Sequence, residues 1–509
     1  AGWGGAQGIS AQGSCCTRNR FTCAAASMAS VALLIAVALP AASAVGHAAF
    51  GSRWRPDWGD VMAPAAAQTP EVPEHCRLAV VGAGWGGTYF AWRLSIDDAT
   101  LFNPSDVCVF EANNRVGGRI FSVRDLPGMG DMAIDVGGYR FKEGDLLPAQ
   151  LVWDALKLPT ACYDYNCSAQ CEGGNCYVIK DAYGNNAGYA TPIETMLGQI
   201  EDEGEGQQVF FGKQLTGIYP AQVPRHVTLR FSDGTRVTAG RVLLNLPEPA
   251  LESLDKGSIV FTHSRRLVRK SLAKVSSKPA AKVYAYYEDA WWSSKLGLME
   301  GYFSSSGGSI PLAGRYHDGP LKCVVGHTIS GDPVYSQKKI PFSNCSGALE
   351  VYYNFGDTFF QQFMTSKLRP LTVLFPNDNR NASDFIGRLH TTLMNHHAHE
   401  FKKAGIKPAS INEPSMVIIS NWLAEAVDTP SCGVFWGDER MHALIRTPAP
   451  AFDLHVADVD YGYSGCWAAG SLIAAEKILQ AELGVSKPAW LEKSWYDEKI
   501  LSLPVDLMV

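Results

Sequence analysis

The chain has 509 residues, of which 46% are hydrophobic and 18% charged, and its formal net charge is -6. So apolar a composition excludes an intrinsically disordered protein, and the length predicts two or three domains with well-filled cores. The slightly acidic balance, without any run of Lys or Arg, argues against nucleic acid as a partner.

The N-terminal part of the chain is predicted to lie outside the folded domains. An apolar run at 31–39 follows two arginines and precedes residues 42–44, which have the small-x-small form of a signal-peptidase site. We expect residues 1–45 to be a targeting segment that is removed on export to the secretory pathway or a plastid (thylakoid) lumen, and 46–75 to be a linker. Two alternatives stay open: a retained membrane anchor through 29–45, and a low-complexity terminus.

Cysteine usage also favours an oxidising compartment. Four cysteines crowd one Gly- and Asn-containing loop: Cys162, Cys167, Cys171 and Cys176. Their spacing lacks the C-x2-C pairs of a structural zinc site, which favours two local disulfides over a metal. Cys323 and Cys345 are candidates for a third disulfide. The histidines at 396–399 lack the H-E-x-x-H spacing and predict a polar helix surface, so we expect no metal site.

Residues 77–110 have the order of a dinucleotide-binding βαβ unit. An apolar run at 77–81 predicts a buried strand, residues 88–96 have helical spacing, and 107–110 predict a second strand. The turn before the helix contains Gly82, Gly84, Trp85, Gly86 and Gly87. Glycines there permit a tight turn and let the backbone approach a pyrophosphate at the helix N-terminus. A Gly-rich structural turn is the alternative interpretation.

An acidic residue, Glu111, ends the second predicted strand. A carboxylate at this position can accept hydrogen bonds from the ribose hydroxyls of a dinucleotide. The same charge would repel a 2'-phosphate, so the sequence disfavours NADP at this site.

The residues from Glu111 onward resemble a long and specific family signature. Positions 111–119 read E-A-N-N-R-V-G-G-R, which is similar to the E-A-x-x-R-x-G-G-R signature of the flavin-dependent amine oxidase family. The resemblance implies noncovalent FAD, with these arginines and glycines around its pyrophosphate and the edge of its isoalloxazine. It gives cofactor-binding roles to Ala112, Arg115, Gly117, Gly118 and Arg119. A solvated loop is the alternative for the two arginines.

The resemblance extends from 77 to about 485 and implies further cofactor contacts. Leu215 falls where the family packs an apolar residue near adenine. Gly137 and Gly138, with Tyr139 after them, form another turn that faces the FAD. Asp438, in the stretch F-W-G-D-E, takes the place of the acid that meets the ribityl chain, with an ordinary Gly-Asp turn as its alternative.

Residues 461–470 resemble the helix start that the family places beneath the flavin. A helix N-terminus there would stabilise the negative charge of a reduced flavin. The resemblance implies contacts from Gly462, Ser464 and Gly465. The tyrosine of the motif is displaced by one position, so Tyr461 and Tyr463 are both candidates for the flavin face, and a packed core aromatic is the alternative for either.

Lys282 is the first candidate catalytic residue. It lies within an apolar and aromatic stretch that ends at Trp291 and Trp292, and it resembles the family lysine that holds a water against the reactive flavin nitrogen. A charged side chain in such a stretch is costly unless it has a partner. A lysine that reaches solvent from an edge strand is the alternative.

Arg140 is the second candidate. It follows Gly137 and Gly138, and the L-amino acid oxidase branch of the family carries here an arginine that binds the substrate carboxylate. A guanidinium group suits bidentate recognition of a carboxylate. The alternative is an ion pair with Glu143 or Asp145.

These expectations combine into an α/β (α+β) flavoprotein with a discontinuous Rossmann-like FAD-binding domain and a substrate-binding domain made of a mixed sheet and helices. The expected boundaries are 76–150, 206–270 and 425–485 for the FAD domain, 151–205 and 271–424 for the substrate domain, and 486–509 for a C-terminal tail. The expected reaction is oxidation of an amine, first of all an L-amino acid, with dioxygen reduced to hydrogen peroxide. A polyamine or other amine oxidase, and a non-catalytic flavin-binding accessory subunit, are the alternatives.

Overall fold

The computed structural model describes twelve stretches of the chain, all within the compact unit Ala48–Val509. They are 71–97, 101–163, 170–171, 174–204, 208–272, 275–305, 308–356, 358–363, 370–422, 432–435, 439–461 and 467–501. Several predictions fall outside these residues: the targeting segment, the linker up to residue 70, Cys167, Asp438, Gly462, Tyr463, Ser464 and Gly465.

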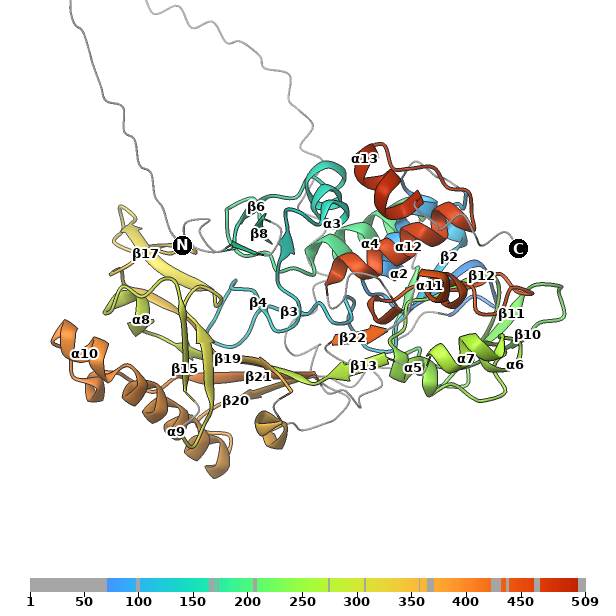
Figure 1. Ribbon diagram of the computed structural model, residues 1–509. Helices are drawn as coiled ribbons and strands as arrows, with labels where there is room; N and C mark the ends of the chain where they lie inside the picture. Colours follow the sequence, from blue (N-terminus) through green and yellow to red (C-terminus); the bar gives the residue numbers. More distant parts are fainter. Residues whose placement is uncertain are drawn as a thin grey trace, which may run out of the picture. The chain divides into compact units, whose positions relative to one another are not determined.

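A seven-stranded sheet forms the first half of the fold (Figure 1). Its central strand β1 (His75–Val81) is parallel to β2 (Val107–Phe110) on one side and to β12 (Arg236–Leu244) on the other. The remaining strands are β9 (Val209–Phe210), β10 (Leu215–Pro220), β11 (Val227–Phe231) and β23 (Leu454–Val456). β9 and β23 continue the parallel arrangement, whereas β10 and β11 are antiparallel.

Helices cover both faces of this sheet, because its strands are apolar on both sides. Leu78 and Val80 of β1 belong to one buried cluster, and Ala79 and Val81 to the other, as the two-residue period of a strand requires. The first cluster includes α2 (Trp85–Ser95), α3 (Leu146–Gln150), α4 (Thr191–Gly204) and α12 (Ala468–Ala481). The second includes α5 (Glu248–Glu252), α6 (Ile259–Thr262), α7 (Arg266–Leu272) and α11 (Glu439–Arg446). This confirms the predicted α/β class and the Rossmann-like βαβ unit.

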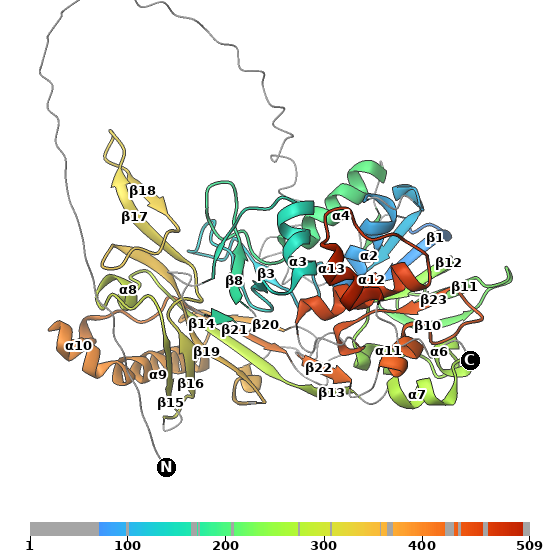
Figure 2. The ribbon, with the colours of Figure 1, turned by 45° about the horizontal axis from the view of Figure 1, so that its top comes forward.

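An eight-stranded sheet forms the second half. Its strands are β14 (Ala280–Tyr287), β15 (Tyr302–Ser305), β16 (Leu312–Arg315), β17 (Leu321–His327), β18 (Pro333–Ser336), β19 (Cys345–Phe355), β20 (Leu371–Leu374) and β21 (Met416–Trp422). The sequence predicted a mixed sheet, but the strand pairs described here are antiparallel. Figure 2 shows β17 and β18 as a hairpin that projects from this sheet.

The two faces of the second sheet have different neighbours. On one face, α8 (Trp291–Ser294), α9 (Arg380–His396) and α10 (Ala398–Ala404) share a core with Val283 and Ala285 of β14. On the other face, Tyr284 and Tyr286 pack against the small ribbon of β3 (Ser122–Val123) and β4 (Ile134–Asp135). Lys282 has the same strand parity as these two tyrosines. It therefore points toward the ribbon and the first half of the fold.

Smaller elements complete the structure. They are β5 (Phe141–Lys142), β6 (Thr160–Cys162), β7 (Gln170–Cys171), β8 (Gly174–Ile179), β13 (Val275–Lys278), β22 (Cys432–Phe435) and α13 (Lys493–Tyr496). Leu491, Tyr496 and Ile500 belong to the first core cluster, so the described part of the predicted C-terminal tail packs against the domain. Within the described residues, none of the helices combines the length and the apolar character needed to cross a membrane.

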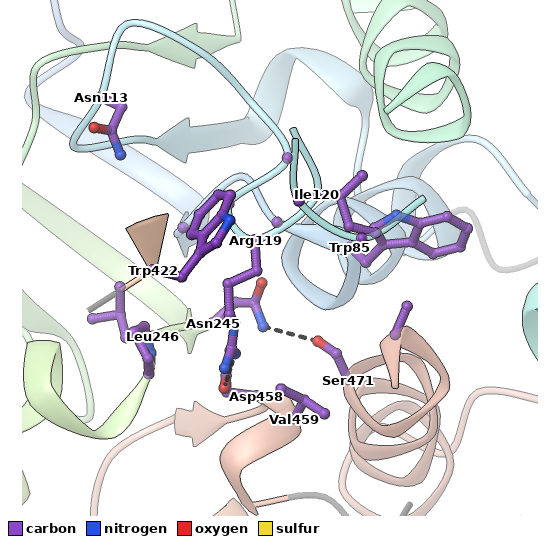
Figure 3. Close-up of a pocket in the computed structure, with 18 of the residues that line it drawn as sticks. Trp85, Asn113, Arg119, Ile120, Asn245, Leu246, Trp422, Asp458, Val459 and Ser471 are labelled. Carbon is purple, nitrogen blue, oxygen red and sulfur yellow. Dashed lines mark hydrogen bonds and ion pairs between the residues drawn. The ribbon is translucent and has the colours of Figure 1, made fainter. Parts of the chain in front are cut away.

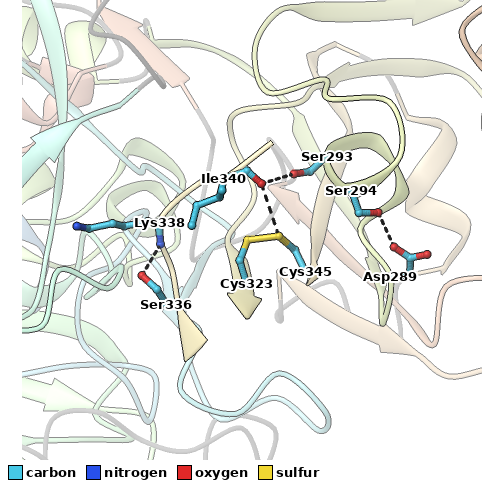
Figure 4. The surroundings of a disulfide bond; sticks show 8 residues. All are labelled: Asp289, Ser293, Ser294, Cys323, Ser336, Lys338, Ile340 and Cys345. Atoms are coloured by element: carbon cyan, nitrogen blue, oxygen red, sulfur yellow. Dashed lines mark hydrogen bonds between the residues drawn. A yellow bond between two sulfur atoms is a disulfide. The ribbon is translucent and has the colours of Figure 1, made fainter. Parts of the chain in front are cut away.

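Two disulfides have both partners among the described residues. Cys323–Cys345 joins β17 to β19 (Figure 4) and confirms the predicted pair. Cys76–Cys108 joins β1 to β2 and was not predicted. Cys162 and Cys176 are also disulfide-bonded, while the predicted pairing within their loop stays a prediction. The described residues contain no group of His, Cys, Asp or Glu side chains that could hold a metal ion.

Replacing Cys76 and Cys108 together with Ser is expected to lower the free energy of unfolding by roughly 2–4 kcal/mol. The bond spans a sequence separation of 32, and it restricts the unfolded chain. Denaturant unfolding of the oxidised proteins measures the difference. The matched variant Cys323→Ser/Cys345→Ser removes a bond with a sequence separation of 22. Its free energy of unfolding should fall slightly less than that of Cys76→Ser/Cys108→Ser. A Cys76→Ser/Cys108→Ser protein as stable as the parent would contradict this account.

Candidate functional site

One cavity of about 740 Å³ is lined by residues from both sheets. The first sheet contributes the ends of β1 and β2, the start of β10 and the residues that follow β12, and the second contributes β14, β16, β19 and β21. Figure 3 shows Trp85 on one side of the cavity, Trp422 and Leu246 on the opposite side, and Asn245 and Asp458 between them. Crevices at the carboxyl ends of parallel strands are where open α/β sheets bind ligands.

The glycine turn after β1 forms part of the cavity wall. Gly82 has a φ of +101° and its N–H donates to the carbonyl of Phe110 at 2.8 Å. A Cβ on Gly87 would lie 2.2 Å from the carbonyl oxygen of Gly82 and 3.0 Å from Val80. Only glycine fits both positions, because the first needs a left-handed backbone and the second has no room for a side chain. Gly82, Gly84 and Trp85 line the cavity, whereas Gly86 and Gly87 pack behind it.

Glu111 ties this turn to the end of β2. Its side chain lines the cavity and accepts a hydrogen bond from the N–H of Ala83 at 3.0 Å. Its other oxygen accepts from the backbone and the side chain of Asn113, both at 3.0 Å. The carboxylate is therefore fixed in place, and it keeps lone pairs that can accept hydrogen bonds from a ligand.

The two arginines of the signature differ in position. Arg115 is buried, donates to the carbonyl of Gly118 at 2.8 Å and lies 4.0 Å from the centre of the Phe121 ring. It does not line the cavity, so it shapes the glycine loop from behind. Arg119 does line the cavity.

Arg119 is held by two acids that sequence reasoning missed. Its guanidinium lies 2.5 Å from Asp458 and 2.7 Å from Asp460. Burial raises the pKa of Asp458 to about 6, although Arg119 favours its ionised form. Two acids within the mainly apolar stretch 456–461 were a signal that could have indicated partners for a buried cation.

Other residues with predicted cofactor-binding roles reach the cavity as well. Its lining includes Ala112, Gly117, Gly118, Gly137, Gly138, Tyr139 and Leu215. Sequence reasoning did not single out several other lining residues, namely Asn245, Arg315, Tyr353, Trp422, Trp467 and Ser471. The side-chain amide of Asn245 donates to Ser471 at 3.2 Å (Figure 3). This bond joins the end of β12 to α12.

Lys282 occupies a central strand, since β14 pairs with both β19 and β21. Its side chain is 2% exposed and lines the cavity, so it does not reach solvent from a strand edge. The ammonium group donates to the carbonyl of Asp135 at 3.2 Å and lies 3.5 Å from the centre of the Tyr139 ring. Burial lowers the pKa of Lys282, which favours its neutral form.

Arg140 lines the same cavity between aromatic rings. Its guanidinium carbon lies 4.8 Å from the centre of the Tyr139 ring, 4.3 Å from that of Tyr163 and 5.9 Å from that of Trp467. Its Nε is buried without a hydrogen bond. Within the described part of the chain Arg140 forms no ion pair, although the buried carboxyl of Asp318 acts on it electrostatically. The predicted alternative, an ion pair with Glu143 or Asp145, is thus absent there.

Tyr461 lies outside the cavity. Its side chain is buried in the second core cluster, and its hydroxyl donates to the carbonyl of Leu272 at 3.2 Å. This position fits the packed core aromatic that the sequence left open as an alternative. Tyr463, the other candidate, lies outside the described residues.

Comparisons with known proteins agree with the fold of the first half. Residues 80–156 match the family model of the NAD(P)-binding Rossmann-like domain. The chain is 34% identical over 88 residues to achacin of Lissachatina fulica, a match that covers 17% of this chain and 15% of achacin. It is 37% identical over 71 residues to aplysianin-A of Aplysia kurodai, which covers 14% and 12% of the two chains.

These matches leave most of each relative uncovered, since the chain spans no more than 15% of the length of either one. The parallel strands, the glycine turn and the matched family model nevertheless agree on one part of the molecule. Residues 80–156 therefore have a Rossmann-like fold similar to that of this family model.

Proposed function

We propose that this protein is an FAD-dependent oxidoreductase of the flavin amine oxidase type and that its substrates are L-amino acids. The observation that carries the proposal is Arg140, a cation on the cavity wall whose Nε is buried without a hydrogen bond. A buried polar group without a partner is costly, and a guanidinium matches a carboxylate in shape and charge. An L-amino acid brings that carboxylate together with an oxidisable amine.

The cavity has features that fit noncovalent FAD. The glycine turn leaves space for a pyrophosphate, and Glu111 offers acceptor oxygens beside it. The indole N–H of Trp85 is buried on the cavity wall without a hydrogen-bond acceptor, so a bound group could satisfy it. Among the described residues that line the cavity, none is a cysteine, which supports noncovalent binding.

Bound FAD would supply the redox chemistry. It would accept a hydride from the carbon that bears the amine and pass the electrons to dioxygen, with hydrogen peroxide as product. The chain would supply binding and orientation. Arg140 would hold the substrate carboxylate, and the rings of Tyr139 and Trp467 would exclude water from the reacting carbon. Lys282 would hold a water or a proton at Nζ. Water then hydrolyses the imine to a keto acid and ammonia.

The proposed compartment is an oxidising lumen or the extracellular space. The two disulfides whose partners are both described support this, because such bonds persist outside reducing compartments. The predicted targeting segment would direct the protein there, with the plastid lumen and secretion as the two destinations.

We expect L-amino acids to bleach the flavin absorbance of the purified protein under anaerobic conditions and to release hydrogen peroxide in air. D-amino acids should do neither, because a fixed carboxylate clamp presents the hydrogen of only one enantiomer to the cofactor. Polyamines and simple monoamines complete the panel. Flavin that no amine reduces would overturn the proposal, and reduction by polyamines alone would replace its substrate class.

Arg140→Ala is expected to raise KM for amino acids by about 10- to 100-fold, as loss of a charge-assisted hydrogen-bond pair costs about 1.5–3 kcal/mol. Amines that lack the carboxylate should change by less than about threefold, since they never used the clamp. Arg140→Lys keeps the positive charge but loses the planar guanidinium, so its KM for amino acids should lie between those of the parent and of Arg140→Ala. An equal loss for both substrate classes would remove Arg140 from carboxylate binding.

Gly87→Ala is expected to lower the fraction of purified protein that carries FAD, because the added Cβ would lie 2.2 Å from the carbonyl oxygen of Gly82. The ratio of flavin absorbance to protein absorbance measures this fraction. Gly326→Ala is the matched control, since its Cβ would have no atom within 4 Å. Full FAD occupancy of Gly87→Ala would show that the turn does not depend on this close approach.

A further inference from the structure

A cluster of buried charges lies behind the cavity wall. The side chains of Asp318 and Glu350 are 1% and 0% exposed. Both contact one atom, Nη1 of Arg315, which lies 3.6 Å from Oδ2 of Asp318 and 3.1 Å from Oε1 of Glu350. Arg315 lines the cavity and neither acid does. Two carboxyl groups thus converge on one guanidinium nitrogen at the edge of the proposed site.

The strand register connects these acids to Lys282. Glu350 on β19 lies opposite Tyr284 on β14 and opposite Arg315 on β16, so the three residues form a row across three strands. The Tyr284 hydroxyl lies 3.4 Å from Glu350 Oε2 and 3.4 Å from the ammonium group of Lys282. Tyr284 therefore bridges Glu350 and Lys282 inside the protein.

Two carboxyl groups this close do not both ionise readily. Burial and the neighbouring Asp318 raise the pKa of Glu350 well above its usual value. Burial opposes ionisation of Asp318 as well, but its contact with Glu350 and the charges of Lys282 and Arg315 hold its pKa below the usual range. The two acids therefore keep one proton and one negative charge between them.

We propose that Asp318 and Glu350 act as one unit, a pair that shares a proton and places a single fixed negative charge behind Lys282 and Arg315. They are positioning residues, which act on the reaction through Tyr284 and Arg315 and set the protonation of Lys282. The inference rests on the proposed function in one respect, namely that Lys282 takes part in amine oxidation.

Other groups also face Lys282, from β4, from the segment after it, from β14 itself and from β19. Besides Arg315 and the acid pair they are Asp135, Tyr139, Tyr284 and Tyr353. The three tyrosines stay neutral, because burial raises their pKa. Burial raises the pKa of Asp135, the remaining acid. Lys282 contacts its backbone carbonyl, while its carboxylate accepts hydrogen bonds from Ser122 and from the N–H of Tyr189. The acid pair is the negative charge that the variants below change.

The shared charge predicts a non-additive response to substitution. Glu350→Gln leaves Asp318 ionised, and Asp318→Asn lets Glu350 ionise once its neighbour is neutral. Each single variant of the FAD-loaded, full-length protein should therefore shift the pH midpoint of flavin reduction by an L-amino acid by less than about 0.5 unit. The double variant loses the charge and should move the midpoint by about one unit or more toward acid pH, because removing a nearby negative charge disfavours protonated Lys282.

Unfolding measured against pH tests the shared proton without any activity. Glu350 keeps a proton that the unfolded chain releases above about pH 4.5. Its stabilisation is therefore complete below that pH and declines as the pH rises toward the raised pKa of the folded state. From about pH 5 up to the raised pKa of the folded state, the free energy of unfolding of the parent should fall more steeply with pH than that of Glu350→Gln, by the slope that one bound proton contributes. Equal slopes would overturn the shared proton, even if the double variant does not fold.

Glu476→Gln provides the matched control. Glu476 is a fully buried acid that contacts Tyr89 at 2.6 Å and Arg93 at 3.4 Å in the first core, outside the cavity lining. Its substitution should lower stability and leave the midpoint of flavin reduction unmoved. Additive shifts in the two single variants, or a double variant with the parental midpoint, would overturn the inference. If no amine reduces the parent, the proposed function fails, and the unfolding slopes alone decide whether the pair exists.

Discussion

The site depends on one extended segment that begins at the last residue of β4 and is held between the two sheets by its backbone carbonyls. The carbonyl of Asp135 accepts a hydrogen bond from Lys282 at 3.2 Å, and that of Val136 accepts from Ser420 at 2.6 Å and from the indole of Trp422 at 2.9 Å. These donors all come from the second sheet. Buried backbone carbonyls need such partners, so the same bonds that satisfy the segment also fix the second sheet against the first. Gly137 follows directly, and there a Cβ would lie 2.3 Å from the carbonyl oxygen of Arg119.

The cationic side chains on the cavity wall differ in the partners that they contact. Arg119 has two acids of its own chain, and Arg315 has two others. Lys282 has a carbonyl and a hydroxyl, which satisfy a neutral amine as well as an ammonium group. Arg140 packs against aromatic rings and forms no ion pair with the described residues. An anionic ligand therefore gains most at Arg140, since at the other arginines it would compete with carboxylates that are already in place.

Local signals predicted much of the fold and part of the site. The βαβ unit could be predicted because the apolar runs, the glycine turn and Glu111 are neighbours in the sequence, and Lys282 stood out as a charge in an apolar strand. Long-range register could not be predicted. The bond Cys76–Cys108 depends on how β1 aligns with β2, and the contact between Arg315 and Glu350 depends on how β16 aligns with β19. Such alignments follow from packing between segments that are distant in the sequence.

The pairing of strand β12 affects the order in which the first sheet assembles during folding. One edge of β12 pairs with β1, and the other pairs with β11 near its start and with β23 at its end. These partners lie far apart in the sequence, so the sheet closes only through contacts of high sequence separation, which form slowly. When β1 and β12 have left the ribosome during synthesis, β23 has not yet been made. Until Leu454–Val456 emerges, the end of β12 keeps an open, apolar edge that can pair with another chain.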